Sequence, residues 1–346
     1  MKEERGGRPG PVLIGLRGAE LSPSERDWLR HPLVGGVVLF TRNYEDLPQL
    51  EALTAAIRAA ADAPMLICVD HEGGRVQRFR SGFTPLPPLG LLGRIYADSP
   101  DVARDFAYRH ARVMATELLV AGVDHSFAPV LDLDIESCVI GERAFHASAP
   151  IVTELGGHYL AGMHDAGMKT CGKHFPGHGS VRADSHVDDV RDERSLEVIR
   201  QHDLRPFEAL LDALDAVMMG HVVYPEVDDE PAGYSTAWVR TILRDELGYG
   251  GVVLSDDLGM HAAGAAGKLA DRARAALGAG CDAVLVCQPD EVAALFDQWG
   301  EEAAPDGSAL QRLAGRCRVT RAELATVSEW RHWQQSLEEL EHSKWA

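Results

Sequence analysis

The densest group of residues capable of acid/base chemistry lies between Lys173 and His186, in the segment KHFPGHGSVRADSH. It holds three histidines, a lysine, an arginine and an aspartate within fourteen residues. Asp184 and His186 are one residue apart, so in an extended segment both side chains face the same side. Asp184 would then accept the imidazole N–H, fix the tautomer and raise the basicity of His186. The pair predicts a general acid/base that works near neutral pH.

A matching carboxylate nucleophile is predicted at Asp256, where the apolar run GVVLS (251–255) ends. Barrel enzymes place their catalytic groups after strands of this kind. A carboxylate there can attack an electrophilic carbon and form a covalent ester, as in retaining glycosidases. Asp257 is predicted to support its neighbour or to cap the next helix. Helix capping by both aspartates is the structural alternative.

Metal binding is the main alternative for the histidine-rich segment. His174 and His178 are four residues apart, which is the spacing of two ligands on one helix face. Asp70, Asp132 and His221 could complete a zinc site. However, a proline and a glycine separate the two histidines and favour a loop, in which the spacing loses its meaning. We therefore predict no metal and keep zinc as the alternative, beside a packing role for His178.

Short apolar runs recur along the chain, and each is followed by a helical pattern. The runs cover residues 12–16, 36–40, 65–69, 127–131, 168–172, 216–220, 251–255 and 283–287. Continuous apolar runs suit strands buried on both faces of a parallel sheet. Between them, Leu50, Leu53 and Ile57 show helical spacing. The order predicts an α/β fold, a single (β/α)8 TIM-type barrel, with a doubly wound open sheet as the alternative.

Polar residues after these runs favour the barrel. They are Arg17, Arg42, Asp70, Asp132, Lys173 with His174, His221, Asp256 and Gln288. A barrel gathers such groups in a ring at its C-terminal mouth, whereas an open sheet gathers them at one switch point. No GxGxxG follows the first run and no GxxxxGK[ST] occurs, which removes the usual nucleotide-binding motifs. We predict a catalytic barrel over residues 1–304 and a helical extension packed on it over residues 305–346.

The charge of the chain restricts its partners. Its 346 residues include 53 acidic and 34 basic side chains, a formal net charge of −19. Such a surface repels nucleic acid and anionic membranes, so neither is expected as a partner. The N-terminal apolar run is too short for a signal peptide or a membrane helix. The six cysteines form no CxxC pair and are expected to be buried and reduced, in a cytoplasmic monomer or weak dimer.

Seven segments together resemble one enzyme family. They are HPLVGGVVLFTRN (31–43), DHEGGRVQRF (70–79), FAPVLDLD (127–134), VIGERAF (139–145), KHFPGHG (173–179), ADSH (183–186) and SDDLGM (255–260). In this order they resemble the family 3 glycoside hydrolases, specifically the single-domain β-N-acetylhexosaminidases of bacterial peptidoglycan recycling. The resemblance spans about residues 11–260.

The resemblance implies a retaining mechanism on terminal β-linked N-acetylglucosamine. It makes Asp256 the nucleophile, His186 the acid/base and Asp184 the partner of that histidine. The positions that correspond to sugar-contacting residues are Asp70, Arg78, Arg143, Lys173 and His174. The implied substrate is a muropeptide, N-acetylglucosamine linked to (anhydro-)N-acetylmuramic acid, and no cofactor or metal is implied. A phosphorylase, a metal-dependent barrel hydrolase and a non-catalytic sugar-binding protein are the alternatives.

Overall fold

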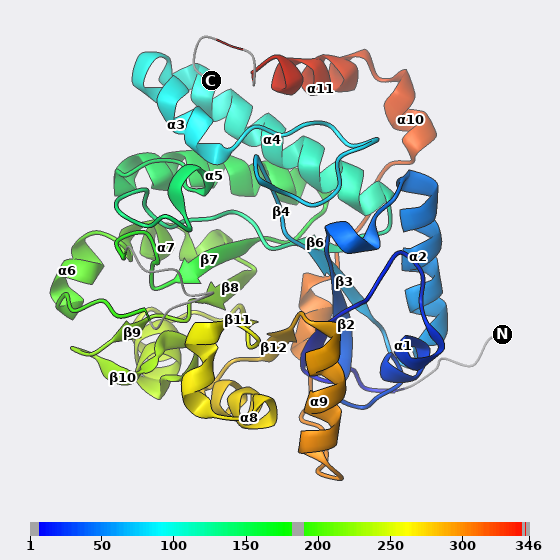
Figure 1. The fold of residues 1–346 in the computed structure, drawn as a ribbon. Helices are drawn as coiled ribbons and strands as arrows, with labels where there is room; N and C mark the ends of the chain where they lie inside the picture. The colour runs from blue at the N-terminus through cyan, green and yellow to red at the C-terminus, as the bar shows by residue number, and fades with distance from the viewer. Residues whose placement is uncertain (1–6, 182–189, 341–342, 344–346) are drawn as a thin grey trace.

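A computed structural model describes residues 7–181, 190–340 and 343, and its centre is a barrel of parallel strands (Figure 1). In this part of the chain the barrel has eight strands: β1 (Val12–Gly15), β2 (Val34–Leu39), β3 (Leu66–Val69), β6 (His125–Ser126), β7 (Cys171–Phe175), β8 (Ala216–Met219), β11 (Val252–Asp257) and β12 (Ala283–Val286). They are hydrogen-bonded in the order β6-β3-β2-β1-β12-β11-β8-β7. Beyond β6, Val130 pairs with Lys173 of β7, which brings the ends of the sheet together. The predicted α/β barrel is confirmed.

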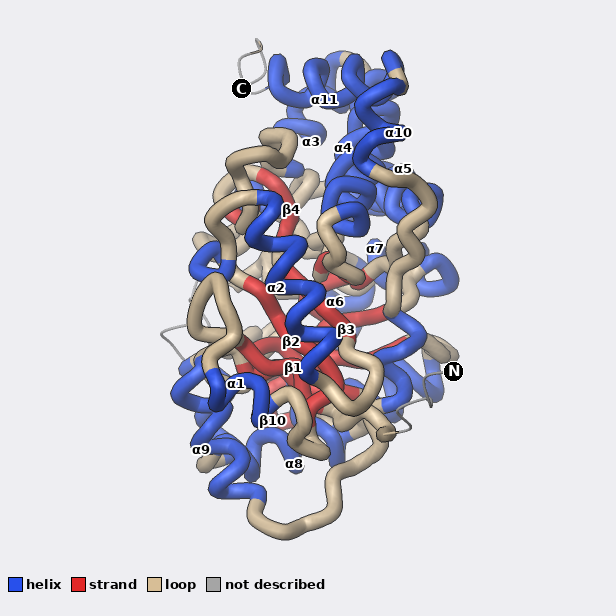
Figure 2. The backbone as a smooth tube through the Cα atoms, turned by 90° about the vertical axis from the view of Figure 1, so that its right-hand side faces the viewer, coloured by secondary structure: helices blue, strands red, loops and turns tan. Residues whose placement is uncertain are grey.

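Helices surround the strands, which lie at the centre of the molecule (Figure 2). The α-helices are α1 (Pro23–Trp28), α2 (Leu47–Ala60), α3 (Leu89–Asp98), α4 (Pro100–Val120), α5 (Ala149–Ala166), α6 (Leu196–Gln201), α7 (Arg205–Leu210), α8 (Leu269–Ala279), α9 (Pro289–Trp299), α10 (Arg321–Thr326) and α11 (Ser328–Leu340). Shorter 3-10 turns are η1 (Thr41–Asn43), η2 (Gly141–Arg143), η3 (Leu211–Ala213), η4 (Ala232–Tyr234), η6 (His261–Ala266) and η7 (Ser308–Leu313), and η5 (Ala237–Glu246) has π-type hydrogen bonds. Antiparallel hairpins pair β4 (His71–Gly73) with β5 (Val76–Gln77), and β9 (Val223–Tyr224) with β10 (Asp228–Pro231).

The helices begin and end where their sequences favour it. Leu50, Leu53 and Ile57 are buried along one face of α2, as their spacing predicts. Asp46 caps this helix by accepting a bond from the backbone N–H of Gln49. Helix α5 ends at Gly167, whose φ of 95° is left-handed and favours glycine. This cap reverses the chain into β7.

The apolar run 168–172 is a poor guide to β7. Met168 follows α5 and takes part in the cap of that helix, because its N–H donates to the Met163 carbonyl. Strand β7 begins at Cys171 and continues through Lys173 and His174, which the sequence places in a loop. The predicted position of this strand was therefore wrong. Lys173 and His174 line a cavity, so this part of the strand is polar and lacks the apolar pattern.

The run 127–131 is also only partly a strand. Strand β6 ends before it, at Ser126, and Val130 alone forms an isolated bridge to Lys173. Pro129 interrupts the run, and proline has no N–H to donate to a neighbouring strand. At β11 the strand is longer than the apolar run, because it continues through both aspartates to Asp257.

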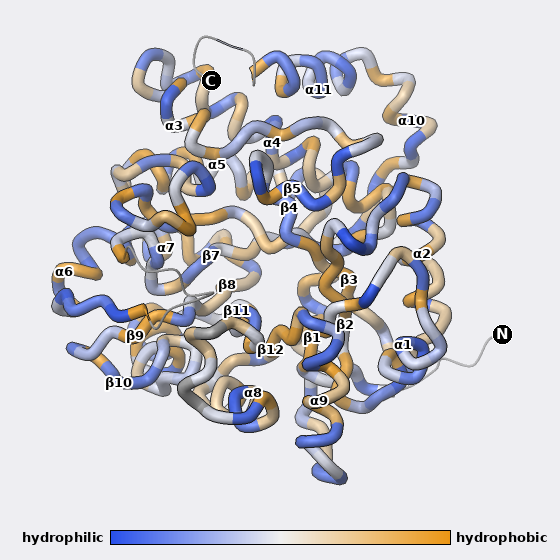
Figure 3. Tube along the Cα trace, in the orientation of Figure 1, coloured by the Kyte–Doolittle hydropathy of each residue, from blue (hydrophilic) through white to orange (hydrophobic). Residues whose placement is uncertain are grey.

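Alternate strand residues face the barrel interior or the helices. The interior cluster includes Leu13, Val38, Leu66, Cys68, Phe127, Cys171, Met218, Leu254 and Leu285. This apolar character is clearest along β3 and β12 in Figure 3. Leu310 and Leu313 of η7 are fully buried in the same cluster, and Leu310 lies near the start of β2. The chain beyond the last barrel helix thus closes the N-terminal end of the barrel with an apolar plug, η7.

The C-terminal helix α11 packs along α4 through buried Trp330, Leu337 and Leu340 (Figure 1). Polar bonds join the same surfaces, because Gln334 donates to Thr84 and to Glu117. We keep the division into a barrel (1–304) and a C-terminal extension (305–346) as a proposal. Within the described residues, no helix is both long and apolar enough to span a bilayer.

The cysteines are all free thiols, but not all are buried. Four are buried, namely Cys68, Cys171, Cys281 and Cys287. Cys138 and Cys317 are exposed, which contradicts the expectation that the cysteines are buried. Both follow polar neighbours in connecting segments, at Ser137 and Arg316, rather than lying in apolar strands.

Candidate active site

A cavity of about 190 Å³ opens at the C-terminal ends of the barrel strands. It brings together six residues predicted from the sequence: Asp70, Arg78, Arg143, Lys173, His174 and Asp256. Phe40, Met218 and Leu285 add apolar surface to its walls. Convergent polar groups in a cavity at the C-terminal end of a barrel are typical of an active site.

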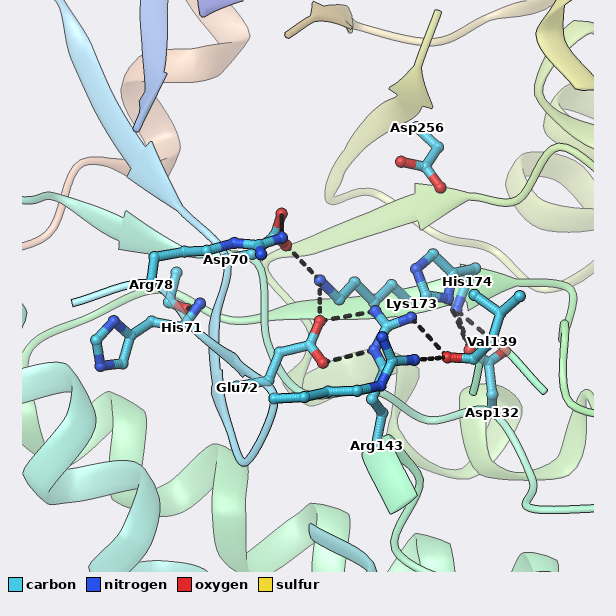
Figure 4. A network of polar contacts seen from close by, with 12 residues as sticks. Asp70, His71, Glu72, Arg78, Asp132, Val139, Arg143, Lys173, His174 and Asp256 are labelled. Carbon is cyan, nitrogen blue, oxygen red and sulfur yellow. Dashed lines mark hydrogen bonds and ion pairs between the residues drawn. The ribbon is translucent and has the colours of Figure 1, made fainter. Parts of the chain in front are cut away.

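A buried network of cations and carboxylates forms one wall of the cavity (Figure 4). Lys173 Nζ lies 2.6 Å from Asp70 Oδ1 and 2.6 Å from Glu72 Oε1. Arg143 donates bonds of 2.8 Å to both oxygens of Glu72, a geometry that fixes orientation as well as distance. Burial alone would raise the pKa of Glu72, but Arg143 and Lys173 hold it well below its ordinary value. Burial lowers the pKa of Lys173, but Asp70 and Glu72 outweigh it and raise the pKa.

His174 is oriented by Asp132, which is fully buried behind it. Asp132 Oδ2 lies 2.7 Å from His174 Nδ1, and the carboxylate also accepts the backbone N–H groups of His174 and His178. Burial would raise the pKa of Asp132, but His174, His178 and these bonds lower it overall. An ionised acceptor requires the proton to be on Nδ1, so Nε2 of His174 is left for a ligand in the cavity.

Asp256 lies across the cavity from this network (Figure 4). Its Oδ1 accepts the backbone N–H of Asp257 at 2.8 Å. Burial raises the pKa of Asp256, but His174, His221 and this bond lower it by more. The carboxylate is therefore ionised at neutral pH, as a nucleophile must be.

Asp257 differs from its neighbour in both contacts and charge. Its Oδ1 accepts the N–H groups of Gly259 and Cys287, each at 3.0 Å. Burial nevertheless raises the pKa of Asp257 to about 6, with further contributions from Asp256 and Glu291. The two aspartates of one strand thus have opposite pKa shifts, and only Asp256 lines the cavity with a lowered pKa. Neither aspartate caps a helix, because η6 begins after Met260.

Arg78 stands at the rim of the cavity. Its Nη2 lies 3.9 Å from Asp70 Oδ2, and its guanidinium stacks over the Phe40 ring at 5.7 Å. Arg42 covers the same ring at 4.4 Å and donates to the Cys287 carbonyl. The rim therefore presents positive charge to the cavity entrance.

Comparison with known protein families identifies the chain. Residues 13–309 match the model described as the glycosyl hydrolase family 3 N terminal domain. The chain belongs to glycosyl hydrolase family 3. The fold, the family and the enzyme class predicted from the motifs are thereby confirmed.

Relatives of this family 3 chain are beta-hexosaminidases. One from Tolumonas auensis is 48% identical over 328 residues, covering 94% of this chain and 96% of the relative. The structure of NagZ from Neisseria gonorrhoeae in complex with N-trifluoroacetyl-D-glucosamine is 41% identical. Its TM-score is 0.88, with 96% of this chain and 98% of that chain covered. NagZ from the same organism also has a structure in complex with zinc ion, 40% identical, with a TM-score of 0.87 and coverage of 96% and 98%.

The predicted acid/base pair of this family 3 hydrolase, Asp184 and His186, lies outside the described residues, which omit 182–189. The remaining predicted site residues are all described and all line the same cavity.

A polar cluster fixes the chain on both sides of residues 182–189. Before them, Ser180 donates to Asp203 at 2.7 Å. After them, Arg194 binds Asp192 at 2.6 Å and reaches the same Asp203 at 2.8 Å. The two flanks are thus joined through one carboxylate.

The residues available for a metal ion are limited in the described part of the chain. Within residues 7–181, 190–340 and 343, no three His, Cys, Asp or Glu side chains are grouped so that they could hold one. Two of the alternative zinc ligands have other partners. Asp132 is hydrogen-bonded to His174, and Asp70 is bound by Lys173.

Three residues of the site were missed or misassigned by sequence reasoning. Glu72 was not considered, although it lies two residues after Asp70 and so shares its side of an extended segment. Asp132 and His221 were placed at the barrel mouth, but the only role considered for them was that of alternative zinc ligands. His221 Nε2 in fact donates to the Asp257 carbonyl at 3.1 Å. Its buried Nδ1 has no hydrogen-bond partner among the residues that the structure describes.

Proposed function

We propose that the enzyme is a retaining exo-β-N-acetylglucosaminidase that removes terminal β-linked N-acetylglucosamine from muropeptides. Asp256 is the nucleophile, His186 is the general acid/base and Asp184 is its partner. The observation that carries the proposal is the ionised Asp256 carboxylate facing a cavity lined by hydrogen-bonding groups. A retaining glycosidase needs this combination of a charged nucleophile and a fixed sugar ring.

In the first step, one oxygen of Asp256 attacks the anomeric carbon and forms a glycosyl ester. The bond from this carbon to the leaving oxygen breaks, and His186 gives that oxygen a proton. In the second step, His186 takes a proton from water, which attacks the same carbon and releases Asp256 as a carboxylate. Two inversions at one carbon give retention of configuration.

The network opposite Asp256 binds the sugar hydroxyls in this proposal. Asp70 accepts bonds, whereas Lys173, Arg78 and Arg143 donate them. His174 presents Nε2 to a hydroxyl because Asp132 occupies Nδ1. Since Lys173 and Arg143 are already held by Glu72, they need little reorganisation when the sugar binds.

The substrate class rests on the resemblance of the motifs and on the relatives. NagZ from Neisseria gonorrhoeae binds an N-acylated glucosamine analogue, which supports an N-acetylglucosamine site here. N-acetylglucosamine linked to (anhydro-)N-acetylmuramic acid is the proposed natural substrate. Action in the cytoplasm, as a monomer or weak dimer without a cofactor, completes the proposal.

Hydrolysis of an aryl N-acetyl-β-D-glucosaminide by the purified protein tests the function. We expect release that a strong chelator does not inhibit, and free N-acetylglucosamine as the product even when phosphate is present. Sugar phosphate as the product would instead identify a phosphorylase. Release that the chelator abolishes would contradict the proposal and indicate a metal-dependent hydrolase.

The Asp256→Ala variant tests the nucleophile. We expect turnover to fall by several orders of magnitude while N-acetylglucosamine still binds, because the covalent step is lost and the pocket remains. The matched control is Asp134→Ala, which removes an exposed aspartate outside the cavity and should keep wild-type turnover. Wild-type turnover in Asp256→Ala would refute the assigned nucleophile.

The His186→Ala variant tests the acid. Aryl substrates with good leaving groups should lose less activity than the natural disaccharide, because such groups need little protonation. Equal losses on both substrates would argue against a proton donor at His186.

A further inference from the structure

The end of β11 carries an irregularity at the predicted nucleophile. Leu254 pairs with Ala283 of β12, whereas Asp257 pairs with Leu285. Three steps along β11 therefore match two steps along β12, so β11 contains one extra residue. Such a bulge redirects side chains and leaves backbone groups without their ladder partners.

The hydroxyl of Ser255 compensates for the bulge. It accepts the Leu285 N–H at 3.2 Å and donates to the Asp256 carbonyl at 2.7 Å. Ser255 is fully buried, where a backbone group without a partner is unfavourable. One side chain thus satisfies a donor on β12 and an acceptor on β11.

The carboxylate of Asp257 fastens the chain just beyond the bulge. Its Oδ1 binds the N–H of Cys287, at the end of β12, and the N–H of Gly259, in the turn that follows β11. Its carbonyl accepts from His221 Nε2 and from the Met260 N–H. The carbonyl of Asp257 and at least one of its carboxylate oxygens therefore have hydrogen-bond partners, and so does its N–H.

The remaining bond of Asp257 is to the nucleophile itself, from its N–H to Asp256 Oδ1 at 2.8 Å. A bond to one carboxylate oxygen restricts rotation of the group and directs the other oxygen. The direction of that N–H depends on where the Asp257 backbone is fixed, and the Asp257 side chain fixes it to β12.

Strand β7 shows the same solution independently. Lys173 pairs with Met218 and Phe175 with Met219, so two steps along β7 match one step along β8. The extra residue is His174, and its backbone N–H is taken by the carboxylate of Asp132. In both strands, a side-chain oxygen stabilises a bulge that turns an active-site residue towards the cavity.

We propose that Ser255 and Asp257 are positioning residues that hold the bulge of β11 and thereby aim the Asp256 carboxylate at the anomeric carbon. This inference rests on the proposed function, because it assumes that Asp256 is the nucleophile. Neither residue touches the sugar in this proposal. Both act through the backbone around Asp256.

The test compares Asp257→Ala, Asp257→Asn and Ser255→Ala with the wild type. The rate of the first aryl-alcohol release is measured by rapid mixing, beside the affinity for free N-acetylglucosamine and the melting temperature. For Asp257→Ala we expect a loss of about 10²-fold in this rate, the order of effect of a misplacement of about 1 Å. Affinity for the sugar should stay nearly unchanged, because the binding network is on other strands.

The conservative variant separates positioning from general destabilisation. The amide oxygen of Asp257→Asn can still accept both N–H groups, so this variant should recover most of the lost rate. Losses in Asp257→Ala should also be equal for good and poor leaving groups, because every substrate needs the nucleophile. The Glu291→Gln control removes a carboxyl near Gly259 and should keep the wild-type rate.

Several outcomes would overturn the inference. They are a wild-type rate in Asp257→Ala, equal losses in the Ala and Asn variants, or a loss of sugar affinity as large as the loss of rate. If Asp257→Ala does not fold, a wild-type rate in both Asp257→Asn and Ser255→Ala overturns it. Failure of the proposed function looks different, because then the wild type releases no aryl alcohol or Asp256→Ala remains active.

Discussion

Glu72 and Glu117 lie in two regions of the molecule with different electrostatic surroundings. Glu72 is buried, whereas Glu117 is partly buried. Glu72 lies in the active-site wall and is bound by Lys173 and Arg143. Glu117 lies on α4, beneath the C-terminal helix, and its partners are neutral. It accepts the Thr84 hydroxyl at 2.6 Å, the Thr84 N–H at 3.0 Å and the Gln334 amide at 2.8 Å.

The difference appears in their pKa shifts. Burial would raise the pKa of both groups, but two cations reverse the effect at Glu72. At Glu117, burial prevails over the hydrogen bonds from Thr84 and Gln334, and the pKa is raised. The charge of the partners, rather than burial, thus decides in which direction the pKa of each carboxylate shifts. The active site fixes charges in place, whereas the contact with the C-terminal helix needs only hydrogen bonds.

The largest effect is expected for Glu72→Gln, which keeps the size of the side chain and removes its charge. Lys173 and Arg143 would then remain buried with reduced compensation. We expect kcat/KM to fall by about 10²-fold or more and the free energy of unfolding to fall by about 3–5 kcal/mol. Enzyme assays and urea unfolding measure the two effects. A stable, active variant would show that the network is not needed to preorganise the site.

The apolar plug η7 offers a second test of what the C-terminal segment contributes. Leu310→Ala should lower the free energy of unfolding by about 2–5 kcal/mol, because it leaves a cavity in the barrel interior. The kcat per folded molecule should not change, since the plug is at the opposite end from the active site. A change in kcat without a change in stability would contradict this separation. The matched control is Leu324→Ala, which truncates a leucine of α10 that is only partly buried.

The pH dependence of stability should have opposite signs for the two glutamates. The pKa of Glu72 is lowered, so its contribution is full above its ordinary pKa of 4.5 and is lost as the pH falls through the folded value. The pKa of Glu117 is raised, so its contribution is full below 4.5 and is lost as the pH rises through the folded value. Urea unfolding of the wild type and both Gln variants across this range measures the differences. Differences of the same sign would refute the comparison.

The smallest effect is expected for Glu117→Gln at neutral pH. The amide oxygen can still accept from the Gln334 amide and the Thr84 hydroxyl. The variant also replaces a carboxyl whose pKa is raised with a neutral group. We expect a change in the free energy of unfolding within about 1 kcal/mol and an unchanged kcat/KM. A large loss of stability would mean that Glu117 has a charged partner in solution. Gln334→Ala is the companion variant, because it removes the contact from the side of α11.

Much of the fold could be predicted because it depends on local patterns. Apolar runs marked most of the strands, and helical spacing marked the buried face of α2. The exceptions were β6 and β7, where a proline or cavity-lining polar residues replace the apolar pattern. Patterns of hydrophobicity describe burial against apolar neighbours, and they fail where a strand is buried against polar ones.

The ring of polar residues after the strands could also be predicted, because parallel strands of a barrel end at one mouth. Asp70, Lys173, His174 and Asp256 do meet in one cavity. The roles assigned to them stay predictions, as do those of Asp184 and His186 outside the described residues. Glu72 could not be inferred from composition, since its significance comes from Arg143 and Lys173, far along the chain.

The sequence by itself therefore determined most of the strands, the family and most of the residues that meet at the mouth, because each follows from short stretches of the chain. Only the tertiary structure decided which of two adjacent aspartates has a lowered pKa, which nitrogen of His174 is free, and where β7 and β11 bulge. These properties depend on partners such as Asp132 and Cys287, which folding brings close from distant positions. The three-dimensional surroundings of a side chain determine its ionisation and its hydrogen bonds, and these surroundings cannot be read from the order of residues in the sequence.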